Sequence, residues 1–454
     1  GLHALQHRGQ DSAGMVTSDH NNFFAHRGMG QVSEAFSNHK ILNELKGKMC
    51  IGHNRYGTTG ESALKNVQPL FSELSIGGIA IAHNGNLTNT HKLKEQLIKS
   101  GSIFQSTSDT EVILHLISTA KGTLIDRLIY ALHSINGAFS LILMTNNTLI
   151  GVRDPFGIRP LVLGKLDNSF ILSSESCGLD IIGAELVRDI EPGEIIVIKK
   201  DKIESVKPFK KTELRPCLFE YIYFSRPDSI LEGRNVYDVR KKIGAQLAKE
   251  NINDKKLVDV VIPIPDSGNA SALGYAEKIK KPFELGIIRN HYTGRTFIQD
   301  SNSIRNLSVK LKHNPNLFSL KDKNIALVDD SIVRGTTSVK IVEMLRNSGV
   351  KKIHMRIASP PVKYPCFYGI DTPTKDELLA SKFSINQIKN YIGVDSLQFV
   401  SLDGVYKALG HSKGRDSKSP KFTDHYFSGD YPVELTDQKS GAIPSQLSLL
   451  IETK

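Results

Sequence analysis

The chain has 454 residues, of which 39% are hydrophobic and 23% charged, with a net charge of +11 and four cysteines. That length predicts two or three globular domains, and no apolar run reaches the roughly 20 residues that a membrane helix needs. The charge favours anionic partners, but like charges are not clustered and Trp is absent, so phosphorylated small molecules are expected rather than nucleic acid. So few cysteines indicate a reducing, cytoplasmic location rather than a disulfide scaffold.

The first half of the chain is dense in short extended segments bounded by Gly, Asn, Asp or Pro. Their β-branched runs predict strands within 48–57, 76–87, 137–154, 159–165, 169–176 and 194–200. Two stretches between them predict helices, 90–101 with a terminal glycine and 108–120 with a Ser108–Glu111 capping box. Antiparallel strands with segregated helices predict an α+β domain.

The second half, from about residue 215, alternates strands with helices. Helices are expected at 235–250, 269–279 and 338–349, and apolar strands at 257–265, 282–290, 324–330 and 351–359. This pattern is typical of a doubly wound, mainly parallel α/β sheet, which binds ligands at the carboxyl ends of its strands. The polar segment 410–430 predicts a surface tail.

One segment of this half, LVDDSIVRGTT at 327–337, ends an apolar strand in two adjacent acids. Gly335 permits close approach of a ligand to the backbone, and Thr336 and Thr337 open the next helix, whose N-terminus favours an anion. Acids beside a phosphate site need a partner such as a sugar diol or a magnesium ion. A bare pair of aspartates would more often lie in a solvated loop, but the whole string predicts a cradle for a phosphorylated sugar.

This string resembles the phosphoribosyl diphosphate (PRPP) loop of type I phosphoribosyltransferases. With FEYIYFSRPDS, VIPIPDSGNASALGYA, RNHYTGRTFIQ and SPPVKYPCFYGIDTP, at 219–229, 261–276, 289–299 and 359–373, it resembles the glutamine PRPP amidotransferase family of purine synthesis. The resemblance implies PRPP binding by Ser267, Gly268, Lys312, Asp329, Asp330, Ser331, Arg334, Gly335, Thr336 and Thr337. It also implies Mg²⁺ held by Ser267, Asp329 and Asp330, whereas Lys312 is equally well explained as a solvated surface lysine.

A second set of residues, in the first half, fits an α-amino acid with a side-chain amide. Arg55 suits its carboxylate, Asp109 suits its ammonium, and the Asn84 side chain with the Gly85 amide suits an oxyanion hole. Singly, Asn84-Gly85 would be a hairpin turn and Arg55 a surface ion pair. With Thr58 and LQHRGQDSAGM at 5–15, the set resembles an N-terminal-nucleophile glutaminase domain, which implies glutamine as nitrogen donor.

Such domains use an N-terminal cysteine, whose thiolate attacks the amide while its own amine serves as base. The printed sequence begins at Gly1, so we expect it to be N-terminally incomplete and, as printed, unable to hydrolyse glutamine. The alternative is a natural ammonia-only transferase. No other cysteine replaces the nucleophile, because Cys50 is expected to be a core thiol and the rest are internal without a free amine: Cys177, Cys217 and Cys366.

Some members of the family it resembles carry an iron–sulfur cluster on four cysteines. Cys217 and Cys366 stand at two of these positions, and the region of the other pair, KSPKFTDHYFSGDYP, has no cysteine. Two thiolates cannot hold a cubane cluster, and neither His411 nor His425 is expected to substitute. We therefore predict no cluster, with Cys217 and Cys366 as buried remnants.

The sequence thus predicts an α+β glutaminase sandwich at 1–207, an α/β phosphoribosyltransferase domain at 208–410 and a polar tail at 411–454. The resemblance implies that glutamine-derived ammonia passes internally and displaces pyrophosphate from PRPP. The product that the resemblance implies is 5-phosphoribosylamine, in the first step of purine biosynthesis. Tyr223, at the junction, is the candidate for coupling the sites, with a core tyrosine as the alternative. Homo-oligomers and feedback by purine nucleotides are also implied.

Three other functions fit the sequence less well. A hexosamine-forming amidotransferase would have a sugar-isomerase half in place of LVDDSIVRGTT. A non-catalytic PRPP-sensing regulator would add a DNA-binding element, and the sequence offers no helix-turn-helix candidate. A nucleobase salvage transferase would leave the predicted glutamine-binding residues unexplained.

Overall fold

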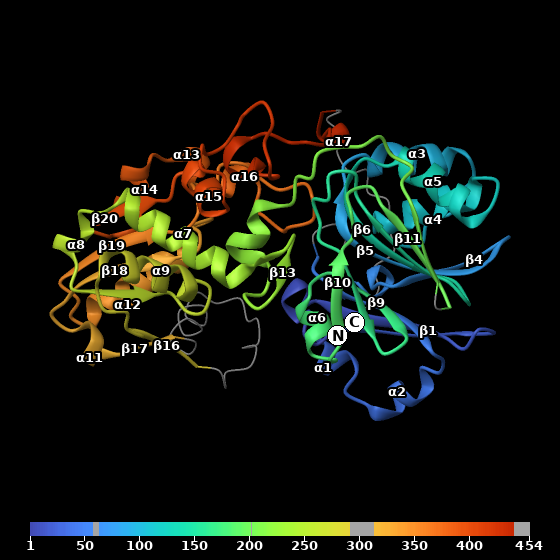
Figure 1. Ribbon diagram of the computed structural model, residues 1–454, viewed down its shortest axis with the longest axis horizontal. Helices are drawn as coiled ribbons and strands as arrows, with labels where there is room; N and C mark the ends of the chain where they lie inside the picture. Colours follow the sequence, from blue (N-terminus) through green and yellow to red (C-terminus); the bar gives the residue numbers. More distant parts are fainter. Residues whose placement is uncertain (58–62, 201, 291–312, 440–454) are drawn as a thin grey trace.

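The structure is a computed structural model that describes residues 1–57, 63–200, 202–290 and 313–439. Two lobes lie side by side, with the N-terminal half of the chain in one and the elements from α7 (Val236–Glu250) to β20 (Ser396–Phe399) in the other (Figure 1). The chain then returns to the first lobe, where α17 (Thr436–Lys439) lies beside α3 (Thr90–Lys99). No helix in these ranges is long and apolar enough to cross a membrane.

A six-stranded antiparallel sheet of order β12-β11-β7-β6-β5-β4 forms the centre of the first lobe. Its strands are β4 (Leu70–Leu74), β5 (Gly77–Leu87), β6 (Gly137–Met144), β7 (Leu149–Arg153), β11 (Ile195–Lys199) and β12 (Lys202–Val206). Helices α3, α4 (Thr110–Thr119) and α5 (Leu124–Ser134) cover one face, because their apolar sides pack on alternate strand residues such as Ile79, Ile81 and Leu141.

Two three-stranded sheets cover the opposite face. Val16 and Ile51 of the first pack against Ala80 and Met144 of the central sheet, and Leu163 of the second clusters with Ile196. The lobe is therefore a sandwich of one helical layer and two sheet layers. The first sheet, β2-β1-β3, contains β1 (Ser12–Ser18), β2 (Phe23–Met29) and β3 (Met49–Arg55), and the second, β10-β8-β9, contains β8 (Val162–Leu166), β9 (Ser169–Ser173) and β10 (Glu185–Asp189).

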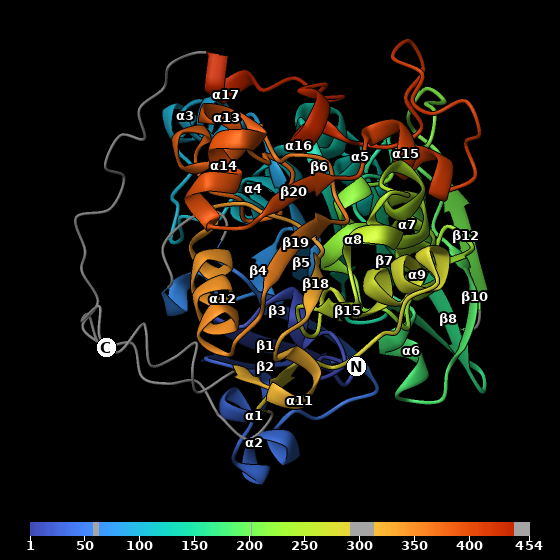
Figure 2. The ribbon, with the colours of Figure 1, turned by 90° about the vertical axis from the view of Figure 1, so that its left-hand side faces the viewer.

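A four-stranded parallel sheet, β15-β18-β19-β20, forms the second lobe with β15 (Val260–Pro263), β18 (Asn324–Asp329) and β19 (Lys352–Ile357). Both faces are covered by helices (Figure 2). Val261 and Ala326 pack toward α7 and α9 (Asn269–Ile279), whereas Ile325 and Leu327 pack toward α12 (Thr336–Asn347) and α14 (Ile385–Ile392). Because both faces are buried, the sequence of each of these strands is a continuous apolar run.

Short elements connect or flank these layers. In the first lobe and the junction they are α1 (Val32–Ala35), α2 (His39–Glu44), α6 (Cys177–Asp180), the π-helical turn Glu220–Phe224, β13 (Ile230–Leu231) and β14 (Arg234–Asn235). In the second lobe and beyond they are α8 (Asp254–Leu257), β16 (Ile287–Arg289), β17 (His313–Pro315), α11 (Leu317–Leu320), α13 (Leu379–Lys382), α15 (Leu402–Ala408) and α16 (His425–Ser428).

Two local predictions are wrong. The segment 282–290 does not join the parallel sheet as a strand, because β16 pairs antiparallel with β17 and only Phe283 bridges to Val261. The Ser108–Glu111 capping box does not form, since the Glu111 carboxylate instead accepts the backbone N–H groups of residues 105 and 106 at 2.7 Å. The sequence patterns also miss α5, β1, β2, β10, β12 and β20.

The prediction of a surface tail after residue 410 is wrong for residues 422–427, although residues 412, 413, 416–418 and 421 before them are exposed. Phe422, Asp424 and Tyr426 are buried in the core of the second lobe. The Asp424 carboxylate accepts the Tyr406 hydroxyl at 2.6 Å, and farther along the backbone N–H of Asp437 donates to Thr88 O at 2.9 Å. Asp424 is buried although it is polar, because its carboxylate is hydrogen-bonded there.

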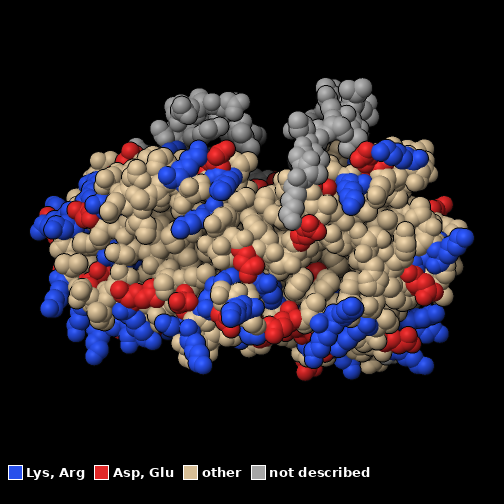
Figure 3. Space-filling model, turned by 90° about the horizontal axis from the view of Figure 1, so that it is seen from above, with Lys and Arg blue, Asp and Glu red and all other residues tan. Residues whose placement is uncertain are grey.

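The cysteines are placed differently from one another. Cys50 is exposed on β3, so the expectation of a core thiol is wrong. Cys217 is buried and Cys366 half-buried, and the Tyr426 hydroxyl lies between them, 3.4 Å and 3.1 Å from the two sulfur atoms. On the surface, the face seen in Figure 3 shows Lys and Arg interspersed with Asp and Glu over both lobes.

Candidate functional site

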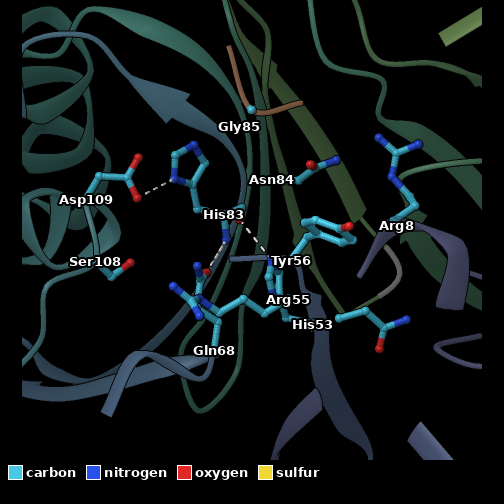
Figure 4. A pocket seen from close by; sticks show the side chains of 12 residues that line it. Arg8, His53, Arg55, Tyr56, Gln68, His83, Asn84, Gly85, Ser108 and Asp109 are labelled. Atoms are coloured by element: carbon cyan, nitrogen blue, oxygen red, sulfur yellow. Dashed lines mark hydrogen bonds and ion pairs between the residues drawn. The ribbon is translucent and has the colours of Figure 1, made fainter. Parts of the chain in front are cut away.

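Four residues predicted to bind glutamine line one pocket of about 40 Å³ in the first lobe, called here the small pocket: Arg55, Asn84, Gly85 and Asp109. They come from three elements, since Arg55 ends β3, Asn84 and Gly85 lie in β5, and Asp109 caps α4 (Figure 4). The structure therefore brings together residues that are far apart in the sequence. Thr58, predicted with them, lies outside the described residues.

The carboxylate of Asp109 is a fixed negative charge in this pocket. Burial alone would raise the pKa of this carboxyl, but His83 and the backbone N–H groups hold it below its usual range. Oδ1 lies 3.6 Å from His83 Nδ1, and Oδ2 accepts the backbone N–H of Leu87 at 3.0 Å. With the buried guanidinium of Arg55, Asp109 gives the pocket an anion beside a cation, the pair that an amino-acid backbone requires.

Other residues of the small pocket were missed by sequence reasoning. They include His83, Arg8 and His53, which stand inside or beside the quoted strings, although nothing in their spacing distinguished them. His53 Nε2 lies 3.0 Å from His83 O, and burial lowers the His53 pKa to about 4, so this ring is neutral at physiological pH. It adds polarity to the pocket without adding charge.

The second lobe contributes Gly369 to the small pocket. Gly369 has a φ of +94°, and a Cβ built on it would lie 2.6 to 2.8 Å from backbone atoms of Gly85. Asn86 Nδ2 also donates to Phe367 O at 3.0 Å, so the loop around Gly369 lies against the end of β5. The glycine is required here both by its backbone conformation and by the close approach of these two segments of the chain.

A much larger cavity of about 810 Å³, called here the wide cleft, lies at the carboxyl ends of β15 and β18. Most residues of the predicted PRPP site line it: Ser267, Asp329, Asp330, Ser331, Arg334, Gly335, Thr336 and Thr337. Gly268 does not line it, because it caps α9 and its N–H donates to Ile264 O at 2.9 Å. Lys312 lies outside the part of the chain that the structure describes.

Asp329 and Asp330 form an adjacent pair of acids at the end of β18. Burial and the neighbouring Asp330 raise the pKa of Asp329 well above its usual value, and burial also raises that of Asp330. The Ser267 hydroxyl hydrogen-bonds to these carboxyls, and Ser331 Oγ donates to Asp330. Two adjacent acids with raised pKa values, one half-buried and one buried, form a site that a cation or a diol would stabilise.

The loop after the acids opens directly into α12. Gly335, with a φ of +75°, is the N-cap residue, and Thr336 and Thr337 form the first turn. The uncapped N–H groups of a 12-residue helix therefore face the cleft, where they favour an anion. Arg334 is more than half exposed, with Nη2 3.0 Å from Glu377 Oε1.

Tyr223 and Arg240 also line the wide cleft. Tyr223 belongs to the π-helical turn and is 51% exposed, so it is not a core tyrosine. Arg240, which sequence reasoning missed, is buried and donates to the backbone oxygens of Tyr221 and Ser225 at 2.9 and 2.7 Å. It ties the π-helical turn to α7 and places a positive charge near Asp330.

The small pocket and the wide cleft are neighbours, because Tyr56 and Gly369 line both. One site can hold an amino acid and an oxyanion, and the other can hold a phosphorylated sugar beside two acids. Adjacent sites of these two kinds fit the transfer of nitrogen from one small molecule to another.

Known proteins show the same combination. Residues 53–180 match the glutamine amidotransferase domain and residues 228–359 the phosphoribosyl transferase domain. The amidophosphoribosyltransferase of Rhizobium etli is 52% identical over 99% of this chain and 91% of its own length, and that of Bacillus subtilis is 45% identical over 96% and 90%. The solved B. subtilis glutamine PRPP amidotransferase, complexed with ADP and GMP, is 43% identical with a TM-score of 0.89, covering 96% of this chain and 94% of that one.

Proposed function

The chain belongs to the amidophosphoribosyltransferases, which catalyse the first step of purine biosynthesis, and from that premise we propose how its two sites divide the reaction. Glutamine is hydrolysed in the small pocket, and PRPP is aminated in the wide cleft. The observation that carries this proposal is that both pockets hold the residue types each substrate needs and share two lining residues, Tyr56 and Gly369.

In the wide cleft, we propose that the loop from Ser331 to Thr337 binds the 5-phosphate of PRPP while Asp329 and Asp330 bind the ribose hydroxyls. The exposed helix N-terminus and the raised pKa values of the acid pair support this assignment. Ammonia attacks C1 from the face opposite the pyrophosphate, which leaves with its bonding electron pair. Ser267, on the loop before α9, is proposed to face the departing pyrophosphate, and Lys312, which lies outside the described residues, is proposed as a further contact.

Mg²⁺ fits the acid pair. Among the described residues, no group of three His, Cys, Asp or Glu side chains could hold a metal alone. This agrees with the usual arrangement, in which one or two carboxylates and the phosphates of the substrate bind the ion together. Asp329, Asp330 and Ser267 would hold it, and when bound it would neutralise the charge that develops on the pyrophosphate.

In the small pocket, Arg55 is proposed to bind the carboxylate of glutamine and Asp109 its ammonium, with Thr58 as a further contact. The Asn84 side chain and the Gly85 amide would stabilise the oxyanion formed at the amide carbon. All four cysteines are described by the structure and none lines this pocket. We therefore propose that the attacking thiolate is that of an N-terminal cysteine outside the printed sequence.

Other features of the family are proposed for this chain on narrower grounds. Tyr223 couples the two sites, as its position in the cleft wall suggests. Purine nucleotides inhibit by feedback, since the B. subtilis relative was solved with ADP and GMP. The protein is proposed to form homo-oligomers in the cytoplasm, to bind no nucleic acid, and to carry no iron–sulfur cluster. The Tyr426 hydroxyl lies between Cys217 and Cys366, so these thiols do not fit a cubane cluster.

The test compares the polypeptide of residues 1–454 with the full product of its gene. Release of pyrophosphate from PRPP is measured with ammonium or with glutamine as the nitrogen donor. The polypeptide should use ammonium alone, whereas the full product should use both. Glutamine use by the polypeptide would refute the assignment of the nucleophile, and an inability to use either donor would refute the assignment of the wide cleft.

A further inference from the structure

Asn84 presents an amide whose two ends have different surroundings. Its Oδ1 accepts a hydrogen bond from Arg159 Nη2 at 3.3 Å, whereas its Nδ2 is buried with no hydrogen-bond partner among the described residues. Asn84 lines the small pocket and lies between Gly85 and Arg8 in Figure 4. A buried amide donor left unbonded is unfavourable, so this Nδ2 is available to an acceptor that enters the pocket.

The orientation of this amide decides what it does to an oxyanion. The oxygen and nitrogen ends of an asparagine have nearly the same size, so packing alone hardly distinguishes them. With nitrogen toward the oxyanion the group donates a hydrogen bond, but after a flip the carbonyl oxygen would repel the same negative charge. A guanidinium has only donors, so Arg159 can donate to the carbonyl end of Asn84 but not to its NH₂ end. This excludes the flipped orientation.

Arg159 is held in place by burial, by Glu220 and by the Phe224 ring, although its Nε and Nη1 have no hydrogen-bond partner among the described residues. It is 1% exposed, and its Nη2 lies 3.2 Å from Glu220 Oε1. Its guanidinium carbon lies 5.3 Å from the centre of the Phe224 ring. Glu220 and Phe224 open and close the π-helical turn that carries Tyr223 into the wide cleft.

The charges of this cluster are balanced. Arg8 Nη2 lies 2.9 Å from the same Glu220 oxygen, and Arg8 also pairs with Glu175, so two arginines face two glutamates. Burial would raise the pKa of Glu220, but Arg8 and Arg159 bring it below its usual value, which keeps this carboxylate ionised. Removal of one buried partner from such a pair normally leaves the other charge uncompensated, but here Arg8 would remain with Glu220.

We propose that Arg159 is a positioning residue of glutamine hydrolysis, which holds the Asn84 amide with its Nδ2 toward the oxyanion while Glu220 holds Arg159. This role rests on the proposed glutaminase function of the small pocket. Arg159 does not touch the substrate and acts only through Asn84. The buried network also ties one half of the oxyanion hole to the segment that lines the wide cleft.

The test is a double-mutant cycle in the full gene product with Arg159→Met, Asn84→Ala and both changes together. Asn84→Ala should lower kcat with glutamine about 100-fold or more, the usual effect of losing one oxyanion donor. Arg159→Met should lower the same kcat about 10-fold or more and leave KM for glutamine within about twofold, because ground-state contacts are untouched. The double variant should be no slower than Asn84→Ala alone, since Arg159 acts through Asn84.

Three controls separate this role from a general loss of structure. Amination of PRPP from ammonium should remain within about twofold in Arg159→Met, and Arg159→Lys, which keeps one charged donor, should recover part of the lost kcat. Arg188→Met removes a distant ion pair with Glu194 and should change neither activity. If Arg159→Met fails to fold, Arg159→Lys with and without Asn84→Ala completes the cycle.

Several results would overturn the proposal. They are an unchanged kcat with glutamine in Arg159→Met, single effects that multiply in the double variant, or an equal loss with ammonium in both Arg159 variants. A different failure is also distinguishable. Wild-type protein that aminates PRPP only from ammonium would refute the glutaminase function itself, and the role of Arg159 with it.

Discussion

The wide cleft and the small pocket differ in how their residues are supplied. The core of the cleft comes from one continuous segment, 327–337, at the end of one strand and the start of one helix. The small pocket is assembled from β3, β5, the start of α4 and a loop of the opposite lobe. A site built on one strand–helix junction can be predicted from a sequence, whereas a site assembled from distant segments depends on how the lobes pack.

The two sites also differ in their electrostatics. The acid pair in the cleft keeps raised pKa values, because burial outweighs the nearby Arg240 charge and the hydroxyl donors. In the small pocket, Asp109 is already compensated by His83, and the neighbouring Glu220 by two arginines. The cleft therefore depends on its ligand for charge balance, while the small pocket is organised in advance.

The largest expected effect comes from the acid pair. The double change Asp329→Asn, Asp330→Asn should lower PRPP turnover about 1000-fold or more with either donor, because it removes the charge that holds the ribose and the cation. Pyrophosphate release measures this loss. Asp322 is an exposed acid that precedes the first residue of β18. Asp322→Asn is therefore the matched control and should retain activity. Turnover near the wild-type rate in the double variant would break the assignment of the cleft.

A smaller and donor-specific effect is expected at Gly369. Gly369→Ala adds a Cβ 2.6 Å from the Gly85 backbone and should lower glutamine-dependent turnover of the full gene product about 10- to 100-fold, with a much weaker effect on turnover with ammonium. Gly410→Ala has nearly the same φ, +97° against +94°, but open space around the added Cβ. Because both substitutions carry the same backbone strain, equal losses in the two variants would show that the contact with Gly85 is irrelevant.

A substitution of Tyr223 tests the coupling that is proposed between the wide cleft and the small pocket. Tyr223→Ala should reduce glutamine-dependent amination about tenfold and ammonium-dependent amination less, since we propose that this ring, which lines the wide cleft, couples the two sites. Steady-state assays with each donor measure the ratio. A variant that loses both activities equally would place Tyr223 in PRPP binding rather than in coupling.

The smallest effect is on stability. The folded pKa of Asp330 is raised above its unfolded value, so the ionised acid destabilises the folded protein at neutral pH, and this penalty disappears as the pH falls through the folded pKa. Asp330→Asn should therefore raise Tm by about 2–4 °C at pH 7.5, with a smaller gain at pH 5. Thermal unfolding without Mg²⁺ or PRPP measures this shift. A lower Tm at pH 7.5 would show that the acid is already compensated.

The sequence predicts one of these regions better than the other for physical reasons. LVDDSIVRGTT contains its own strand, acids, glycine and helix start, so both its position and its chemistry are predictable. The sequence predicts Arg55, Asn84 and Asp109 by chemical type, but Gly369, Arg159 and Glu220 depend on contacts across 61 to 284 residues of chain, which no local pattern encodes. The polar composition after residue 410 predicts a tail but conceals the short buried stretch 422–427, whose Asp424 is hydrogen-bonded in the core.

The most direct test of the paired sites follows the nitrogen atom. The full gene product is given PRPP and glutamine labelled with ¹⁵N in the side-chain amide, in the presence of excess unlabelled ammonium. Because the two pockets share Tyr56 and Gly369, we predict that 5-phosphoribosylamine retains most of the label. Product nitrogen that matches the isotopic composition of the bulk ammonium would contradict internal transfer between the small pocket and the wide cleft.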